Sequence, residues 1–200
     1  IRRDLPVELV QKEARSLIVE RDVPSDALYV AFPMYDRLHA NYQAADLLSD
    51  VLSNGSSSRL YRNLVKEQAV FVELDAYLGG DKDPSLFIFS GKPNEGVSLE
   101  KAEEALWKEI ERIKAEEVDQ QELQKVKNKI ESSMIFGEVN ILNKAMSLAY
   151  YECLGNADGL NQEVEKYRIV SPQQIQKVAQ DLFCKEKSNT LYYHSKKASK

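Results

Sequence analysis

The sequence predicts an α+β fold, a two-layer sandwich with helices packed on one face of an antiparallel-rich sheet. Runs rich in β-branched and aromatic residues occur near both ends, and apolar residues at helical spacing fill most of the second half. The expected element order is β-β-α-α-β-β-α-α-α-α-α-β, which separates the strands from a long helical run. With 200 residues, 43% of them hydrophobic, the chain can bury one sizeable core.

The strands are predicted from alternation and turn residues. Strands at 16–20 and 27–34 flank a turn at Pro24, and a hairpin pairs 70–78 with 86–91. Neither face of 27–34 is polar, so we expect this strand to be covered on both sides. A last strand at 189–193 rejoins the sheet.

The apolar residues of the strand at 70–78 are predicted to share one face. Apolar and polar residues largely alternate there, and side chains two apart point to the same side of a strand. We therefore expect Val70, Val72, Leu74 and Ala76 to share one face.

Helix ends are predicted from capping residues. A helix at 39–53 ends at Asn54-Gly55, where glycine tolerates a left-handed backbone, and any of Ser56 to Ser58 can cap a second helix at 58–68. Ser98, Asp119 and Ser171 are expected to begin later helices, Asp119 with Glu122 at capping-box spacing. We also expect Gly137 to interrupt a helix and Gly155 to end the one at 140–154.

Composition excludes some classes of partner. A net charge of −5, well mixed along the chain, argues against nucleic acid, because phosphate binding needs a concentrated basic face. No apolar run is long enough for a membrane span, and no signal peptide is present. The chain opens with Ile1, so we expect its true N-terminus to lie upstream. Residues 1–13 are charged, carry Pro6 and show no clear period, so we expect a linker from a preceding domain there. We expect 14–195 to be the folded domain and 196–200 to be a basic tail. The compartment is left undetermined.

No catalytic or metal-binding residue is predicted. A zinc peptidase helix carries H-x-x-E-H, and a catalytic zinc site needs three protein ligands. The chain has only His39 and His194, far apart and without that motif. The serine turn lacks G-x-S-x-G and there is no phosphate-binding loop, so no cofactor is expected in this chain.

Two motifs resemble those of a known family. The run Ser57-Ser58-Arg59-Leu60-Tyr61 after a Gly/Ser turn is similar to a segment of the pitrilysin, insulinase and mitochondrial processing peptidase family of zinc metallopeptidases. Residues 122–127, ELQKVK, resemble the E-L-x-x-x-K opening of a later helix in the same family. The resemblance extends over 14–194 and is to the second, C-terminal, non-catalytic domain of these proteins.

The resemblance implies a role for the chain. Family members pair two similar domains like a clam, so the implied partners are an H-x-x-E-H catalytic domain or subunit, which would hold the zinc, and a peptide substrate. The fold implied is that of a processing-peptidase domain, forming one wall of a peptide-binding chamber.

The resemblance also implies site residues, and this sequence departs from them. In the family an arginine of the short helix and a tyrosine seven residues later reach toward the substrate. Val65 and Val72 stand at those positions here, and neither side chain donates a hydrogen bond. We expect Val65, Val72 and Leu74 to face the substrate by apolar contact, with Arg59 and Arg62 as nearby alternatives, although Arg59 is better explained by a pairing within the fold.

Three interpretations follow from the sequence. The chain is the non-catalytic half of a zinc-dependent metalloendopeptidase, which positions substrate for an H-x-x-E-H half outside this chain. The alternative, motivated by the two valines, is a catalytically dead structural or assembly subunit of the same fold. A third is an unrelated α+β binding domain whose serine-rich turn mimics the motif.

Overall fold

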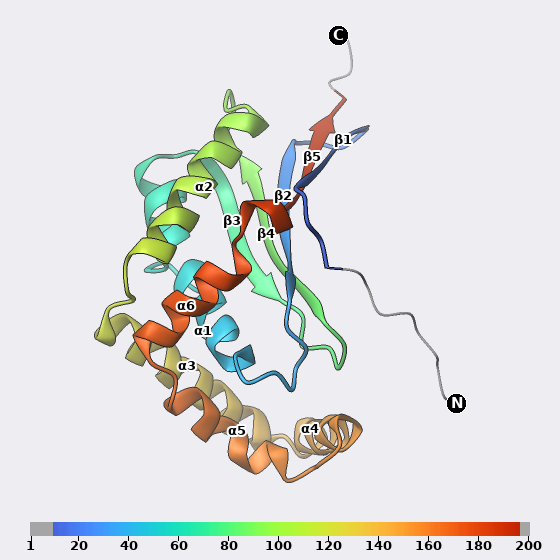
Figure 1. Cartoon of the computed structure of the whole chain (residues 1–200), viewed down its shortest axis with the longest axis vertical. Coiled ribbons are helices and arrows are strands. Elements are labelled where there is room, and N and C mark those ends of the chain that lie inside the picture. Colours follow the sequence, from blue (N-terminus) through green and yellow to red (C-terminus); the bar gives the residue numbers. More distant parts are fainter. Residues whose placement is uncertain (1–9, 197–200) are drawn as a thin grey trace.

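The computed structural model describes residues 10–196 and has the predicted α+β architecture. Figure 1 shows one sheet with helices gathered on one side of it. The strands are β1 (Arg15–Arg21), β2 (Ala27–Met34), β3 (Phe71–Leu78), β4 (Ser85–Pro93) and β5 (Asn189–Ser195). The helices are α1 (Tyr42–Ser53), the π-helix η1 (Tyr61–Glu67), α2 (Leu99–Ala115), α3 (Gln120–Val139), α4 (Ile141–Leu154), α5 (Gly159–Arg168), α6 (Pro172–Leu182) and the 3₁₀ turn η2 (Lys185–Lys187). Most of the predicted linker and basic tail lies outside the described residues.

The five strands form a single mixed sheet in the order β1-β5-β2-β4-β3. Strand β1 pairs with β5 in parallel, and the other neighbours are antiparallel. Strand β5 comes last in the chain and lies between β1 and β2, so the two ends of the domain meet in the sheet. Strands β1 and β3 are its two edges.

Only one face of the sheet is buried. In β2 the side chains of Leu28, Val30 and Phe32 are inside, whereas Tyr29 and Pro33 are exposed. The expectation that this strand is covered on both sides is therefore wrong. The reason is that α1, α2 and α6 all pack on the same side of the sheet (Figure 1).

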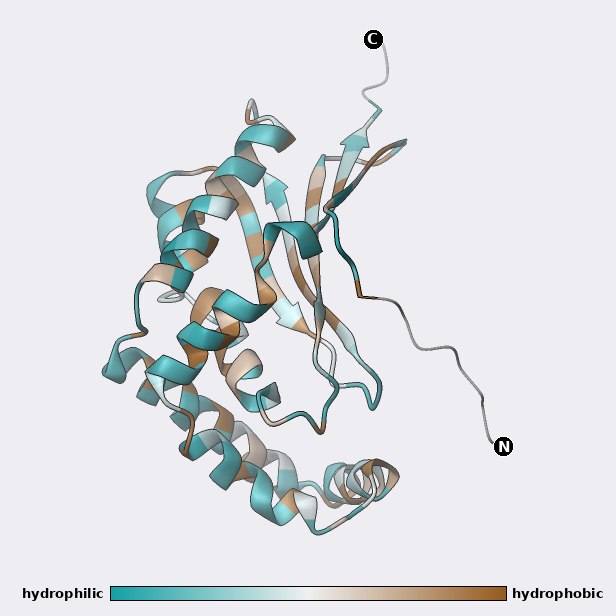
Figure 2. Ribbon diagram, in the orientation of Figure 1, coloured by the Kyte–Doolittle hydropathy of each residue, from teal (hydrophilic) through white to brown (hydrophobic). Residues whose placement is uncertain are grey.

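The core lies between the sheet and those helices. Phe32, Phe87, Phe89 and Phe183 form an aromatic cluster with ring centroids 5.0–6.2 Å apart, mostly tilted or edge-to-face. These geometries are favourable for aromatic rings and add to the burial of their apolar surface. Figure 2 shows apolar residues along the central strands and on α1, which packs against them.

Most predicted helix ends are confirmed. The side chains of Ser98, Asp119 and Ser171 each accept hydrogen bonds from backbone N–H groups of the first helical turn. Gly55 and Gly155 end α1 and α4 with φ of +95° and +119°. These are left-handed conformations that glycine adopts without a steric cost.

Two expectations about helix ends are wrong. Helix α3 continues through Gly137 to Val139, and Asn140 caps α4 instead. No serine side chain caps η1, and the buried Ser58 hydroxyl has no hydrogen-bond partner among the described residues. The backbone carbonyl of Ser58, which accepts from the Arg62 N–H, begins that helix.

Candidate functional site

The candidate site is built on η1 and β3, the segment that carries the sequence motif. Because η1 is a π-helix, its last turn closes through a wide bond from the Gln68 N–H to the Asn63 carbonyl. Ala69 follows with φ of +49°, a left-handed backbone that costs a non-glycine residue about 1 kcal/mol. The side chain of Asn94 donates to the Ala69 carbonyl at 2.8 Å and its N–H donates to Val70 at 2.9 Å. These bonds to the residue that follows β4 hold the entry into β3.

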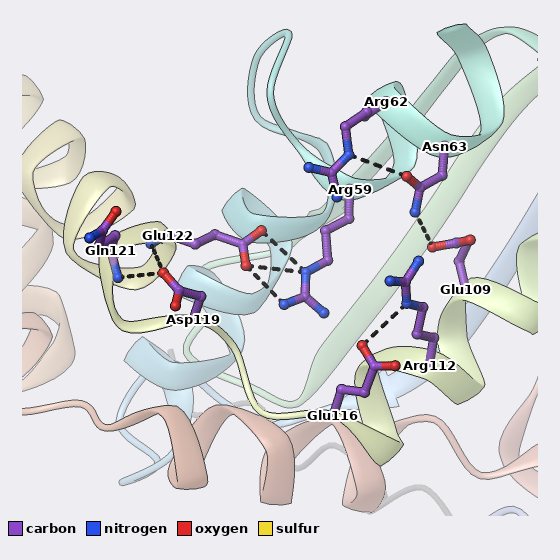
Figure 3. A network of polar contacts seen from close by, with 9 residues as sticks. All are labelled: Arg59, Arg62, Asn63, Glu109, Arg112, Glu116, Asp119, Gln121 and Glu122. Atoms are coloured by element: carbon purple, nitrogen blue, oxygen red, sulfur yellow. Dashed lines mark hydrogen bonds and ion pairs between the residues drawn. The ribbon is translucent and has the colours of Figure 1, made fainter. Parts of the chain in front are cut away.

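Arg59, two residues before η1, pairs with Glu122 of α3 and so ties the two helices together (Figure 3). The Arg59 guanidinium donates through Nε and Nη2 to both carboxylate oxygens at 2.8–3.2 Å, and both side chains are largely buried. The predicted pairing of Arg59 within the fold is confirmed. Glu122 consequently does not complete the capping box with Asp119.

Asn63 fixes the other side of η1. Its side-chain amide donates to Glu109 of α2 at 2.7 Å, and both residues are buried. Arg62 donates to Asn63 at 3.3 Å (Figure 3), and the residue is exposed. Of Arg59 and Arg62, Arg62 is therefore the one open to a ligand.

A β-bulge at the start of β3 turns Val72 outward. Phe71 pairs with Pro93 and Glu73 with Lys92, so Val72 is an extra residue in the ladder. Its side chain is 59% exposed, and the prediction that it shares the core-facing side with Leu74 and Ala76 is wrong. Phe71, fully buried, takes its place in the core.

The three predicted substrate-facing residues lie at different depths. Val65 is half-buried on η1 and packs against the core. Val72 is exposed on β3, whereas Leu74 is 5% exposed and belongs to the core. The exposed surface of this trio is thus supplied by Val72 and by part of Val65.

The uncovered face of the sheet carries several exposed apolar side chains, whereas Val72 itself lies next to the exposed ion pair of Glu73 with Lys92. Tyr29, Tyr77 and Leu86 are each more than one-third exposed, and the pairing of Tyr77 with Ile88 and of Leu86 with Pro33 places them on one side. Among residues 10–196 strand β3 is an edge of the sheet, and its Ala76 carbonyl accepts a hydrogen bond from the Ser53 hydroxyl of α1 at 2.9 Å. Such an edge can bind an extended peptide as an added strand.

A second polar cluster, far from η1, was not predicted. Arg37, in the loop before α1, donates to Glu163 of α5 at 2.6 Å and to the Tyr151 hydroxyl of α4 at 3.0 Å. Gln43 donates to the same Glu163 oxygen at 3.0 Å. Arg37 is 114 positions from Tyr151 and 126 positions from Glu163 in the chain. No local sequence pattern signals a pairing over such a separation.

Arg37 and Glu163 form an ion pair that is largely removed from solvent. Burial alone would raise the pKa of Glu163, but hydrogen bonding by Gln43 and the nearby Arg37 charge hold its pKa below the ordinary value. Burial raises the pKa of Tyr151 and of Tyr167. Two depressions, of about 360 and 410 Å³, are both lined by Arg37 and Glu163. Because these two side chains neutralise each other, they offer a ligand in either depression no uncompensated charge.

The two histidines are not brought together. His39 is exposed and stacks on Tyr35 with ring centroids 4.1 Å apart, and His194 lies 3.6 Å from Asp26. Among residues 10–196 no group of three or more His, Cys, Asp or Glu side chains is placed to hold a metal ion. Within the same residues no helix is long and apolar enough to cross a membrane.

The fold and surface define a class: a two-layer α+β domain with an open apolar sheet face, an accessible edge strand and no metal-ligand cluster in its described part. The family model "Peptidase M16 inactive domain" matches residues 2–130. The chain belongs to this family, the inactive domain of the M16 zinc proteases.

Known relatives agree with this assignment. The chain is 24% identical over 183 residues to the zinc protease PqqE of Helicobacter pylori, a match that covers 91% of this chain and 41% of that protein. Its fold is similar to that of a protease from Helicobacter pylori, with a TM-score of 0.86 at 23% identity, covering 92% of this chain and 45% of the other. It is also similar to an M16 inactive domain from Pseudomonas fluorescens, with a TM-score of 0.74 at 15% identity, covering 96% and 46%. The chain thus spans less than half the length of these relatives.

Proposed function

We propose that this domain is the non-catalytic half of a zinc-dependent metalloendopeptidase and forms one wall of its peptide-binding chamber. The observation that carries the proposal is the open sheet face, which exposes Tyr29 of β2 and Leu86 of β4, together with Val72 and Tyr77 of the edge strand β3. Apolar and aromatic side chains next to unpaired backbone groups suit an extended peptide, whose own backbone they can pair and whose side chains they can cover.

Hydrolysis is assigned to another half that carries H-x-x-E-H. The zinc protease name of the matched relative, together with the partial coverage of that relative, supports a parent protein or complex with such a half. The zinc would be held there, and the glutamate of that motif would act as general base on the zinc-bound water. This domain would position substrate and exclude water from the chamber.

Val65 and Val72 would then hold substrate by apolar contact. An arginine and a tyrosine at these positions could donate hydrogen bonds to a peptide, whereas two valines cannot. Exposed Arg62 and Lys66 supply the cations of η1. Discrimination by this wall would therefore depend on substrate shape and apolar surface more than on backbone hydrogen bonds from side chains.

The test is to purify the native protein from its source cells with an antibody against this chain. The expected preparation contains an H-x-x-E-H sequence, as a separate subunit or in a band near twice 22.8 kDa, together with zinc. Removing zinc with a chelator should abolish peptide cleavage, and the purified 200-residue chain should neither bind stoichiometric zinc nor cleave. Cleavage and zinc binding by the 200-residue chain alone would overturn the division of labour.

A second candidate function is that of a structural or assembly subunit without peptidase activity. The observation that favours it is the pair of valines, since both side chains that the family uses at these positions are missing. A native preparation that lacks any H-x-x-E-H polypeptide but contains other stoichiometric subunits would support this candidate over the first.

A further inference from the structure

Three irregularities of the backbone follow one another where η1 leads into β3. The first is the π-helix η1 itself, and the second is Ala69, which has the only positive φ of a non-glycine residue among residues 10–196. The third is the bulge between Phe71 and Glu73, which leaves Val72 as an extra residue. Departures of this kind cost free energy, so they persist where surrounding contacts fix them, and they gather at functional sites.

The contacts that fix the bulge come from the end of β4, which lies beside β3 (Figure 1). Pro93 pairs with Phe71 in the ladder. Lys92 pairs with Glu73 and forms an ion pair with it at 2.6 Å. Gly91 leaves room for the Phe71 ring in the core, because a Cβ atom there would lie 2.7 Å from the ring. The bulge is therefore held from three successive positions of β4.

Asn94, the residue after β4, holds the backbone that precedes the bulge. Its side-chain amide donates to the Ala69 carbonyl at 2.8 Å, and its backbone N–H donates to the Val70 carbonyl at 2.9 Å. Among the described residues, no other side chain hydrogen-bonds the backbone of 68–73. The backbone bond would survive a substitution at position 94, whereas the bond to Ala69 needs an amide donor.

The side-chain bond of Asn94 is exposed, which limits its contribution to overall stability. When an exposed hydrogen bond is removed, water takes the place of the lost partner, so the cost to folding is small. The left-handed backbone of Ala69 is disfavoured, however, and without the bond it is less firmly held against the ordinary conformations of a non-glycine residue. The bond therefore acts on the local direction of the chain more than on whether the domain folds.

We infer that Asn94 is a positioning residue of the proposed peptide-binding wall, because it fixes the backbone that leads into the bulge and so the direction of Val72. The inference depends on the proposed function, in which Val72 contacts substrate. The Val72 side chain is 59% exposed, and a short, β-branched side chain cannot reach out to compensate for a shifted backbone. A displacement of about 1 Å is enough to weaken a contact with a bound peptide.

The experiment introduces Asn94→Ala into the protein in its source cells and measures peptide cleavage by the purified native complex. We expect KM to rise about fivefold while kcat changes less than about twofold, the signature of lost uniform binding. The matched control is Asn161→Ala, which removes an exposed side-chain bond of 2.9 Å to Asp158 at the start of α5 and should leave both constants unchanged. A KM equal to that of the wild type in Asn94→Ala would overturn the inference.

A double-mutant cycle separates positioning from a general structural role. If Asn94 acts through Val72, Asn94→Ala should change KM less than about 1.5-fold in a Val72→Asp background, where the apolar contact is already lost. A general loss of folded protein would instead lower kcat by the same factor in both backgrounds. The inference is overturned if Asn94→Ala raises KM by the same factor in both, or if it lowers kcat alone.

Hydrogen exchange separates failure of the inference from failure of the proposed function. In the same native complex, exchange over 68–74 should be about threefold faster in Asn94→Ala than in the wild type, with no change over α2. If the complex cleaves peptides but KM or this exchange is unchanged, the inference is overturned and the proposed function stands. If the native preparation contains no H-x-x-E-H polypeptide and cleaves no peptide, the proposed function fails and the inference fails with it, whatever the exchange shows.

Discussion

Arg37 donates a hydrogen bond to Glu163 at 2.6 Å, across 126 positions of the chain. The two side chains are only 10% and 1% exposed, so the loop before α1 is tied to α5 by a largely desolvated ion pair. The guanidinium also lies over the Tyr42 ring, 4.3 Å from its centroid. This cluster anchors α4 and α5, the part of the domain with the smallest core.

Breaking this pair is expected to be costly. Glu163→Gln leaves a buried guanidinium without its counter-charge, which should lower the free energy of unfolding by about 3 kcal/mol. Urea denaturation measures the change. The control is Glu104→Gln, which removes an exposed i,i+4 pair with Lys108 and should leave the unfolding midpoint unchanged. A similar small effect in both variants would contradict this assignment.

Asp46 should make stability depend on pH. Burial, partly offset by the Tyr167 hydroxyl that donates to it at 2.5 Å, raises its pKa above the unfolded value. The native state therefore keeps this proton to higher pH than the unfolded chain, and stability falls as pH rises from the unfolded pKa, about 3.9, through the raised native pKa. The Asp46→Asn variant has no ionisable group at this position, so it does not lose stability in this way as pH rises. Its amide oxygen can still accept the hydrogen bond from the Tyr167 hydroxyl.

The stability of Asp46→Asn relative to wild type should consequently increase as pH rises through this window. Urea denaturation of both chains at a series of pH values measures the difference. The lowered pKa of Glu163 acts in the opposite direction, with its stabilisation lost as pH falls, but it is common to both chains and cancels. A difference that is flat, or that shrinks with rising pH, would refute the prediction.

The left-handed backbone at Ala69 predicts a stabilising substitution. Ala69→Gly removes the steric cost of φ +49° but adds entropy to the unfolded chain, for a net gain of about 0.5 kcal/mol. Thermal or urea unfolding detects it. Ala105→Gly, within α2, should instead lose about 1 kcal/mol, so the two substitutions should differ in sign.

Gly91 in β4 is expected to tolerate no side chain. A Cβ atom there would lie 2.7 Å from the Phe71 ring and 2.8 Å from Leu74. Gly91→Ala should therefore destabilise the domain by about 2 kcal/mol through overpacking. Combining it with Phe71→Leu, which frees space, should cost less than the sum of the two single changes in urea unfolding. Additive costs would show that the clash is relieved elsewhere.

Val72 should matter to substrate binding but not to folding. Because its side chain is exposed, Val72→Asp should change the free energy of unfolding by less than about 0.5 kcal/mol. In the assembled peptidase it should raise KM about tenfold with little change in kcat, the signature of lost uniform binding. Val72→Thr, of nearly the same shape, is the matched control. Equal KM values for the Asp variant and wild type would remove Val72 from the proposed wall.

Local signals were enough to predict the elements and most of their ends. The caps at Ser98, Asp119 and Ser171 and the glycine stops at Gly55 and Gly155 depend on bonds and dihedral angles within a few residues, so the sequence carries them. The pairing of Arg59 inside the fold was also predicted. Its partner Glu122, 63 positions away, was not, because nothing near Arg59 in the chain signals it.

By itself the sequence determined the class of fold, the family motif and the absence of an H-x-x-E-H run. Tertiary structure alone decided which surfaces stay uncovered. The bulge turns Val72 outward, and helices on one side leave the β2 face open. The physical reason is that side-chain alternation and helical period are local properties, whereas burial depends on which distant elements pack against each face.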